Sequence, residues 1–278
     1  MTSVDIVIAN YNGREGLELC IESIARYTPE PHRVIIYDDA STNPGDVAYL
    51  LKAAVNEIRI GRNHVGHGGA LNALINGADP DTEYVAVIDN DIQIRRSGWL
   101  TALLDLADTP QVLAVCDDKD TFGYCSRGYR PEMFLLWFGL LNMSAYRDGM
   151  QVDWARADAA RADEPWRSKF AALYPPEDNA EWQQLRKTQA WYSDFDRERV
   201  IFDPGATLWA KMRYENPKGY VSRPLTPWLR ESFHHWGHAQ HWLAPGMEYT
   251  PQGCSMRANI ENELRRLREG TWTGKISP

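Results

Sequence analysis

The first hundred or so residues alternate between short apolar runs and segments with helically spaced apolar residues. The apolar run at 4–9 stops at turn-forming residues, and helical spacing follows at Leu17, Cys20, Ile21 and Ile24. Further apolar runs lie at 34–37 and 84–88, and a short strand is predicted at 58–60. Alternation of strands and helices predicts an α/β fold in which a doubly wound, mostly parallel sheet is flanked by helices.

Polar residues close each long predicted strand. They are Asn10 and Asn12, then Asp38-Asp39, then Asp89-Asn90-Asp91. Ligands of a doubly wound sheet bind beyond the carboxyl ends of its strands, so we expect these residues to face one crevice. Carboxylates suit hard cations, and the triplet therefore indicates Mn2+ or Mg2+ and a phosphorylated substrate. An ordinary turn or helix cap is the alternative role of such a triplet.

Four segments resemble the family 2 glycosyltransferases with the GT-A fold. They are Tyr11-Asn12, Asp38-Asp39-x-Ser, Asn63-x-x-Gly66 leading into Ala-Leu-Asn, and Asp89-x-Asp91. The resemblance implies a nucleoside diphosphate sugar as donor, with UDP favoured, and a cation held by Asp91 and Asp89. It also implies that Asp39 contacts the nucleobase and that the remaining donor contacts come from Ala9, Asn10, Asn12, Asp38, Asn63, Gly66, Asp89 and Asn90.

The second half contains a segment that resembles the second signature of the same family. On that pattern Asp203, at the start of a predicted helix, is the catalytic base of an inverting transfer, and His234, with His235 close behind, is a further metal ligand. Phe202 stands where the family often has an acidic residue. A helix cap is the alternative role for Asp203, and a structural turn or a contact with the donor diphosphate is the alternative for the histidines. The rival bases are Asp194, Asp196, Glu215 and Glu231.

Composition narrows the class of protein. The net charge of −8 disfavours binding of nucleic acid by a broad basic surface. The four cysteines lack Cys-x-x-Cys spacing, and the longest apolar run is too short to span a bilayer. We therefore expect a cytoplasmic protein with buried free thiols.

The chain divides into three predicted parts. Residues 1–116 form the nucleotide-sugar-binding half, 117–254 an acceptor-side half with a tryptophan-rich insertion at about 151–199, and 255–278 a C-terminal helix and tail. Ser97 is predicted to cap a helix that begins near Trp99. The helix at 255–269 carries apolar residues on one side and arginines around it, so docking onto the domain is favoured over peripheral contact with a membrane.

These features predict a metal-dependent glycosyltransferase. A sugar nucleotidyltransferase and a catalytically silent nucleotide-sugar-binding protein remain as alternatives. The acceptor stays open among a glycan, a lipid-linked sugar, a small molecule and a modified nucleic-acid base.

Overall fold

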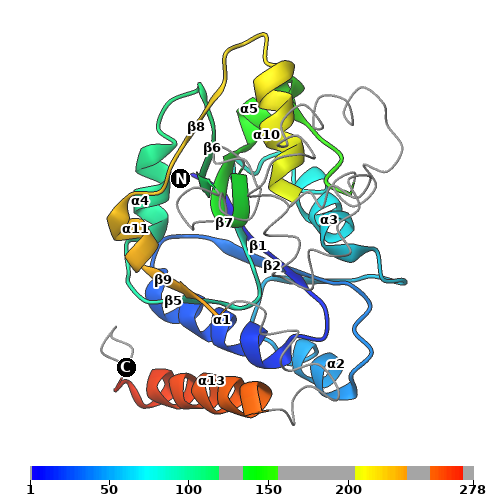
Figure 1. The fold of residues 1–278 in the computed structure, drawn as a ribbon, viewed down its shortest axis with the longest axis vertical. Coiled ribbons are helices and arrows are strands. Elements are labelled where there is room, and N and C mark those ends of the chain that lie inside the picture. The colour runs from blue at the N-terminus through cyan, green and yellow to red at the C-terminus, as the bar shows by residue number, and fades with distance from the viewer. Residues whose placement is uncertain (1, 119–133, 156–203, 237–250, 272–278) are drawn as a thin grey trace, which may run out of the picture.

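A seven-stranded sheet forms the centre of the computed structural model, which describes residues 2–118, 134–155, 204–236 and 251–271 (Figure 1). The strand order is β3-β2-β1-β4-β7-β6-β8. Pairing is parallel between β1, β2, β3 and β4 and between β6 and β8, whereas β7 is antiparallel to both of its neighbours. The predicted mostly parallel α/β sheet is confirmed. The strands are β1 (Val4–Asn10), β2 (Arg33–Asp38), β3 (Glu57–Ile60), β4 (Tyr84–Ile88), β6 (Val112–Asp118), β7 (Phe134–Asn142) and β8 (Val221–Arg223).

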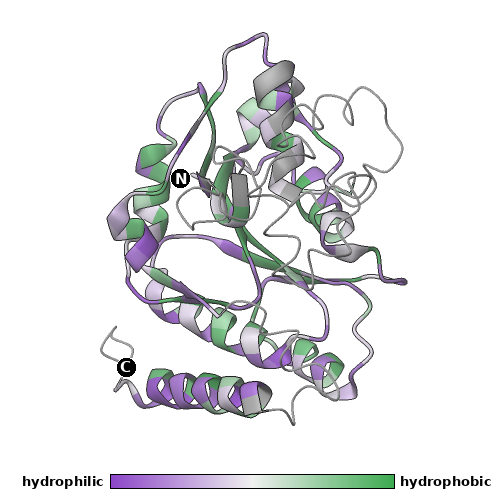
Figure 2. Cartoon of the chain, in the orientation of Figure 1, coloured by the Kyte–Doolittle hydropathy of each residue, from purple (hydrophilic) through white to green (hydrophobic). Residues whose placement is uncertain are grey.

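Both faces of the sheet are buried. Alternate residues of a strand point to opposite faces, so Val7 contributes to one hydrophobic cluster while Ile6 and Ile8 contribute to the other. The first cluster includes Leu71 and Leu208 from the helices on its side. Burial on both faces explains why these strands appear in the sequence as continuous apolar runs, which show as green strands in the interior (Figure 2).

Helices cover the sheet on both sides. α1 buries Leu17, Cys20, Ile21 and Ile24, the apolar face that its spacing predicts. α3 continues directly into the π-helical turn η1, and α5 continues into η3. The bounds are α1 (Arg14–Tyr27), α2 (Pro44–Leu50), α3 (Gly66–Leu71), η1 (Asn72–Asn76), α4 (Trp99–Leu106), α5 (Met143–Ala145), η3 (Tyr146–Met150), α10 (Pro204–Tyr214) and α11 (Pro227–Glu231).

A small antiparallel ribbon stands apart from the main sheet. It pairs β5 (Ile92–Ile94) with β9 (Phe233–His235), two segments that are far apart in the sequence. The C-terminal helix α13 (Pro251–Glu269) lies along α1 below the ribbon (Figure 1). Ile260, Leu264 and Leu267 bury against Leu19. The predicted docking of this helix onto the domain is therefore confirmed.

Two details refine the predictions from the sequence. Gly98, not Ser97, caps α4, because it adopts a left-handed conformation (φ 83°) that glycine tolerates, and the cap makes no side-chain hydrogen bond. Cys20 and Cys116 are buried and form no disulfide, as predicted, whereas Cys254 is exposed and Cys125 lies outside the described residues. Within the part of the chain that the structure describes, no helix has the length and hydrophobicity required to cross a membrane.

Candidate functional site

A buried network of hydrogen bonds joins the carboxyl ends of three neighbouring parallel strands. Asn90, just after β4, donates from Nδ2 to Oδ1 of Asn10 at the end of β1 (2.8 Å). Asn10 in turn donates to Oδ1 of Asp38 at the end of β2 (2.9 Å), which also accepts from the Ser41 hydroxyl (2.6 Å). Asn10, Asp38 and Asn90 are all nearly inaccessible. The predicted convergence of polar strand ends is present, and these three side chains fix the loops of the site relative to one another.

Asp39 lies one residue beyond this network and holds the beginning of α3. Its two carboxylate oxygens accept from the backbone N–H groups of Val65 (2.7 Å) and Gly66 (2.8 Å). The His64 ring places Nδ1 2.7 Å from the Asp39 carboxylate and lies tilted against the Tyr11 ring, with centroids 4.2 Å apart. Gly66 has φ 77°, a conformation that favours glycine. Asp39 thus builds the wall of the crevice. Among the described residues, its Oδ1 accepts only from Val65 and retains lone-pair capacity for a ligand, whereas Oδ2 contacts both Gly66 and His64.

The other predicted donor contacts have different environments. Asn12, with φ 48°, uses its Oδ1 to accept from the backbone of Thr42 (2.9 Å) and Asn43 (3.1 Å). Ala9 is half-buried near the end of β1, and Asn63 is exposed in the loop after β3. Asn12 therefore connects two loops of the site, while Asn63 presents its amide to solvent.

Three potential metal ligands converge immediately after β4. Ligand atoms of Asp89, Asp91 and His235 all lie within 4.8 Å of one another. Nε2 of His235 is 3.1 Å from Oδ1 of Asp91. Asp89 is partly exposed and Asp91 is buried. Two carboxylates and one imidazole form a set of ligands that could hold a divalent cation.

The surrounding backbone positions these three side chains. The N–H of Asp89 donates to the carbonyl of Trp137 in β7 (2.7 Å), and the N–H of Trp236 donates to the carbonyl of Asp91 (3.0 Å). In the ribbon, His235 lies opposite Ile92. The Trp137 ring meets the His235 ring edge-on, with centroids 4.2 Å apart. The metal group therefore depends on the pairing of β4 with β7 and of β5 with β9.

Close approach of α1 also shapes the group. A Cβ atom on Gly16 would lie 3.1 Å from the Asn90 carbonyl and 3.3 Å from Cβ of Asp91. Behind the group, the Cys20 Sγ is 3.8 Å from the Asp89 carbonyl oxygen. Burial, and then the charges of Asp91 and Asp89, raise the pKa of the Cys20 thiol. Cys20 is therefore a neutral packing residue and not a nucleophile.

The two predicted histidine ligands point in different directions. Adjacent strand residues face opposite sides of a ribbon, so only His235 reaches the carboxylates. The His234 ring lies edge-on to Trp236, with centroids 4.7 Å apart. Burial, followed by the charge of Arg95, lowers the pKa of His234 to about 4. Burial also disfavours the charged form of His235, but contact with Asp91 outweighs it and the pKa of His235 is raised.

One neighbour of the metal group was not assigned from the sequence. Nε2 of His67, in the first turn of α3, lies 3.8 Å from Oδ1 of Asp89. His67 is in the same segment as Asn63 and Gly66, but nothing in a linear pattern indicates that this segment reaches the end of β4. Only the packing of α3 against β1 brings them together.

The predicted base lies outside the described residues. Asp203 directly precedes α10, which begins at Pro204, so the predicted helix after it is present. Asp194, Asp196 and most of the tryptophan-rich insertion are also outside the described part. Of the rival bases, Glu215 is exposed and Glu231 pairs with Arg96 (3.2 Å).

The mostly parallel sheet, with polar strand ends beside two carboxylates and an imidazole, is typical of α/β proteins that bind their ligands at the carboxyl edge of the sheet. The model of glycosyl transferase family 2 matches residues 5–158. The chain belongs to this family, which confirms the predicted GT-A fold and the class of enzyme, a glycosyltransferase. No curated protein sequence matches the chain.

Several solved structures are similar at low identity. GalNAc-T7 with UDP, GalNAc and Mn2+ is 14% identical over 42% of this chain and 23% of that chain, with a TM-score of 0.37. The mannosyltransferase PcManGT from Pyrobaculum calidifontis, in complex with GDP-Man and Mn2+, is 14% identical over 95% and 86%, with a TM-score of 0.44. Glucosyl-3-phosphoglycerate synthase from Mycobacterium tuberculosis, with Mn2+, UDP and glucosyl-3-phosphoglycerate, is 14% identical over 51% and 57%, with a TM-score of 0.40. The match thus spans less than two thirds of the first and third of these proteins.

Proposed function

We propose that this family 2 member is a metal-dependent glycosyltransferase that moves a sugar from a nucleoside diphosphate sugar, with UDP favoured, to an acceptor hydroxyl. The observation that carries the proposal is the convergence of Asp89, Asp91 and His235 at the carboxyl edge of the sheet. This is the edge at which doubly wound sheets bind their ligands.

The three potential metal ligands are chemically suited to Mn2+ or Mg2+. Asp89 and Asp91 supply oxygens and His235 supplies a nitrogen, a mixture that Mn2+ accepts readily and Mg2+ less so. The two carboxylates would repel each other without a counter-charge, and His235 alone supplies at most one positive charge. When bound, the cation would neutralise charge that develops on the leaving diphosphate and would orient it.

The nucleoside of the donor is assigned to the neighbouring strand ends. Asp39, with the Tyr11 and His64 rings beside it, offers acceptor oxygens and an aromatic surface to a nucleobase. The network from Asn10 to Asp38 and Asn90 keeps this region rigid relative to Asp89, near which the ribose would lie. A rigid crevice lowers the ordering cost of binding a flexible dinucleotide-sized ligand.

The transfer itself is proposed to invert the anomeric carbon. Asp203 would take the proton from the acceptor hydroxyl as that oxygen bonds to the anomeric carbon. The bond from the anomeric carbon to the diphosphate oxygen breaks, and the nucleoside diphosphate leaves on the opposite face. The position of Asp203 immediately before α10 supports a carboxylate at a helix start, and the assignment as base rests on the family resemblance.

The test is a screen of sugar nucleotides by thermal shift, with and without Mn2+. A bound donor stabilises the native state by mass action, so the true donor should raise the melting temperature only when the cation is present. Incubation of that donor with Mn2+ should then release nucleoside diphosphate slowly by hydrolysis. A screen in which no sugar nucleotide stabilises the protein, while a nucleoside triphosphate with a sugar phosphate yields pyrophosphate, would replace this proposal by a nucleotidyltransferase. The anomeric configuration of the product, measured by NMR, tests inversion separately, and a retained configuration would rule inversion out.

The acceptor and the cellular location are also proposals. The tryptophan-rich insertion is assigned to the acceptor side, because aromatic faces stack on sugar rings. A reducing cytoplasm is the proposed location, supported by Cys20, Cys116 and Cys254, which form no disulfide.

A further inference from the structure

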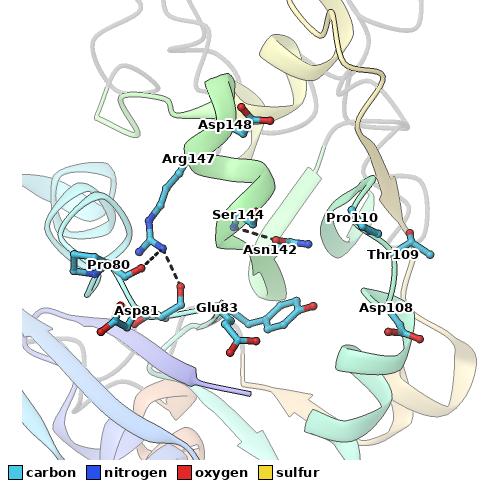
Figure 3. A pocket seen from close by; sticks show the side chains of 12 residues that line it. Pro80, Asp81, Glu83, Asp108, Thr109, Pro110, Asn142, Ser144, Arg147 and Asp148 are labelled. Carbon is cyan, nitrogen blue, oxygen red and sulfur yellow. Dashed lines mark hydrogen bonds between the residues drawn. The ribbon is translucent and has the colours of Figure 1, made fainter. Parts of the chain in front are cut away.

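A pocket of about 780 Å³ opens at the opposite end of the sheet from the metal group. Its walls come from the start of β4, the end of the antiparallel strand β7 and the loop before β6 (Figure 3). β4 runs from Tyr84 to Ile88, so roughly 16 Å of strand separates this pocket from Asp89. The pocket is therefore distinct from the proposed donor site.

Three carboxylates at this pocket are not paired with a cation of the described residues, and Arg147, which also lines the pocket, donates to backbone carbonyls instead. Asp81, Glu83 and Asp108 line it, and among the described residues none of their side chains forms an ion pair or a hydrogen bond. Burial, and then the charges of Glu83 and Asp108, raise the pKa of Tyr84, which also lines the pocket. Exposed carboxylates of one sign gathered in a concave site focus negative potential there.

The floor of the pocket presents a hydrogen-bond donor. Asn142 is 7% exposed, and its Oδ1 accepts from the N–H groups of Ser144 (3.1 Å) and Ala145 (3.3 Å). Its amide nitrogen has no partner in the described part of the chain, and it points toward the side of the pocket formed by Asp108 and Pro110 (Figure 3). Most of the residue is buried, but this nitrogen is open to the pocket, so the amide can donate a hydrogen bond to a ligand oxygen.

The walls are held in place before any ligand binds. Arg147 donates to the carbonyls of Asp79 (2.6 Å), Pro80 (2.9 Å) and Thr82 (3.0 Å), which clamps the loop before β4. On the far side, Lys218 pairs with Asp148 (2.5 Å). A preformed pocket loses little conformational entropy when it is filled.

We propose that this pocket is a docking site for an extended basic peptide segment of a partner protein. A lysine or arginine side chain lies between Glu83 and Asp108, and a peptide carbonyl accepts a hydrogen bond from the Asn142 amide. Negative potential selects the cation and raises its rate of association. The Asn142 amide selects a ligand that carries a hydrogen-bond acceptor close to its positively charged group. A peptide backbone supplies such an acceptor, whereas a simple amine does not.

The test is calorimetric titration of the full chain with a capped Gly-Lys-Gly-Lys-Gly peptide at low ionic strength. We expect binding that weakens with salt, and no binding of the matched Gly-Gln-Gly-Gln-Gly peptide. Glu83→Gln and Asp108→Asn should each lower the affinity for the lysine peptide about threefold, and the double variant about tenfold. Asp105→Asn is the matched control, because this exposed carboxylate of α4 does not line the pocket, and it should leave binding unchanged.

The floor is tested by Asn142→Ser. Serine preserves an oxygen to cap α5 but removes the amide donor, so the fold is retained while peptide binding falls about fivefold. Equal binding of the two peptides, or equal loss with Asp105→Asn and Asp108→Asn, would overturn the proposal. Spermidine that binds as tightly as the lysine peptide would also overturn it, because an amine alone would then suffice. If the melting temperature of each variant is unchanged, a loss of peptide binding comes from the altered pocket and not from unfolding.

Discussion

The clearest test of the metal group compares two adjacent histidines. The resemblance placed His234 first as a ligand, whereas the structure brings His235 to Asp89 and Asp91. Replacing His235 by Gln removes one of three protein ligands but keeps a polar side chain of similar size beside Asp91. Replacing His234 by Gln leaves the three ligand atoms intact and is the matched control.

The expected size of the effect follows from mass action. Removing even an outer partner of a metal ligand costs up to about 100-fold in affinity, so losing the ligand itself should cost at least that. At about 100 times the wild-type dissociation constant, Mn2+ adds about 2.7 kcal/mol of stability, which falls to about 0.4 kcal/mol after a hundredfold loss. An unfolding entropy of about 2.1 cal/mol/K per residue over 278 residues converts these values into shifts of about 5 °C and about 0.7 °C.

The assay is thermal unfolding of metal-stripped protein titrated with Mn2+. Wild type and His234→Gln should both gain about 5 °C, although the His234 variant can start from a lower temperature because it loses its contact with Trp236. His235→Gln should gain less than about 1 °C. The opposite pattern, in which only His234→Gln loses the Mn2+ shift, would refute the register of the ribbon and with it the assigned site.

Three further substitutions probe the site. Asp91→Asn should lower metal-dependent transfer about 100-fold or more while the apo protein still folds, and undiminished transfer would remove the cation from the mechanism. Asp203→Asn should lower kcat by about 100-fold to 10,000-fold and leave nucleotide binding nearly unchanged, which calorimetry with nucleoside diphosphate and Mn2+ measures. Equal losses in kcat and in nucleotide binding would instead assign Asp203 a structural role. Gly16→Ala should cost about 1–3 kcal/mol and weaken Mn2+ binding, because the added methyl group meets the Asn90 carbonyl at 3.1 Å. Alanine favours a helix more than glycine does, so without this contact the substitution would raise the melting temperature. A higher melting temperature would therefore contradict the packing argument.

Local patterns predicted much of the fold and the first two ligands. The buried strands appear as continuous apolar runs, and α1 shows its face in the spacing of Leu17, Cys20 and Ile24. The polar strand ends follow from a general property of parallel sheets, which places Asn10 and Asp89 at one edge without any knowledge of the remaining chain. These features depend on residues that are close in sequence.

The third ligand depends on strand register, which no local pattern contains. His234 and His235 are chemically equivalent in the sequence, and a shift of one residue in the pairing of β9 with β5 would exchange their directions. The prediction for Asp39 was similarly incomplete, since its contacts with Val65 and Gly66 require the loop after β3 to fold back over β2. Contacts between distant segments decide both cases.

The register of the ribbon is in turn fixed by residues that never touch the metal group. A two-stranded ribbon has little stability of its own. One face of this ribbon buries Ile92, Ile94 and Phe233 in the main core. On β5, Gln93 is also buried and donates to Glu263 of α13 (3.3 Å).

Shifting β9 by one residue would turn Phe233 out of the core and move Trp236 away from its packing against α13. Losing the burial of one large apolar side chain costs roughly 1.5–3 kcal/mol, which makes the shifted register rare. The orientation of His235 toward Asp91 is therefore enforced from both sides of the ribbon. A helix at the C-terminal end of the described chain thereby contributes to a metal group built from residues 89, 91 and 235.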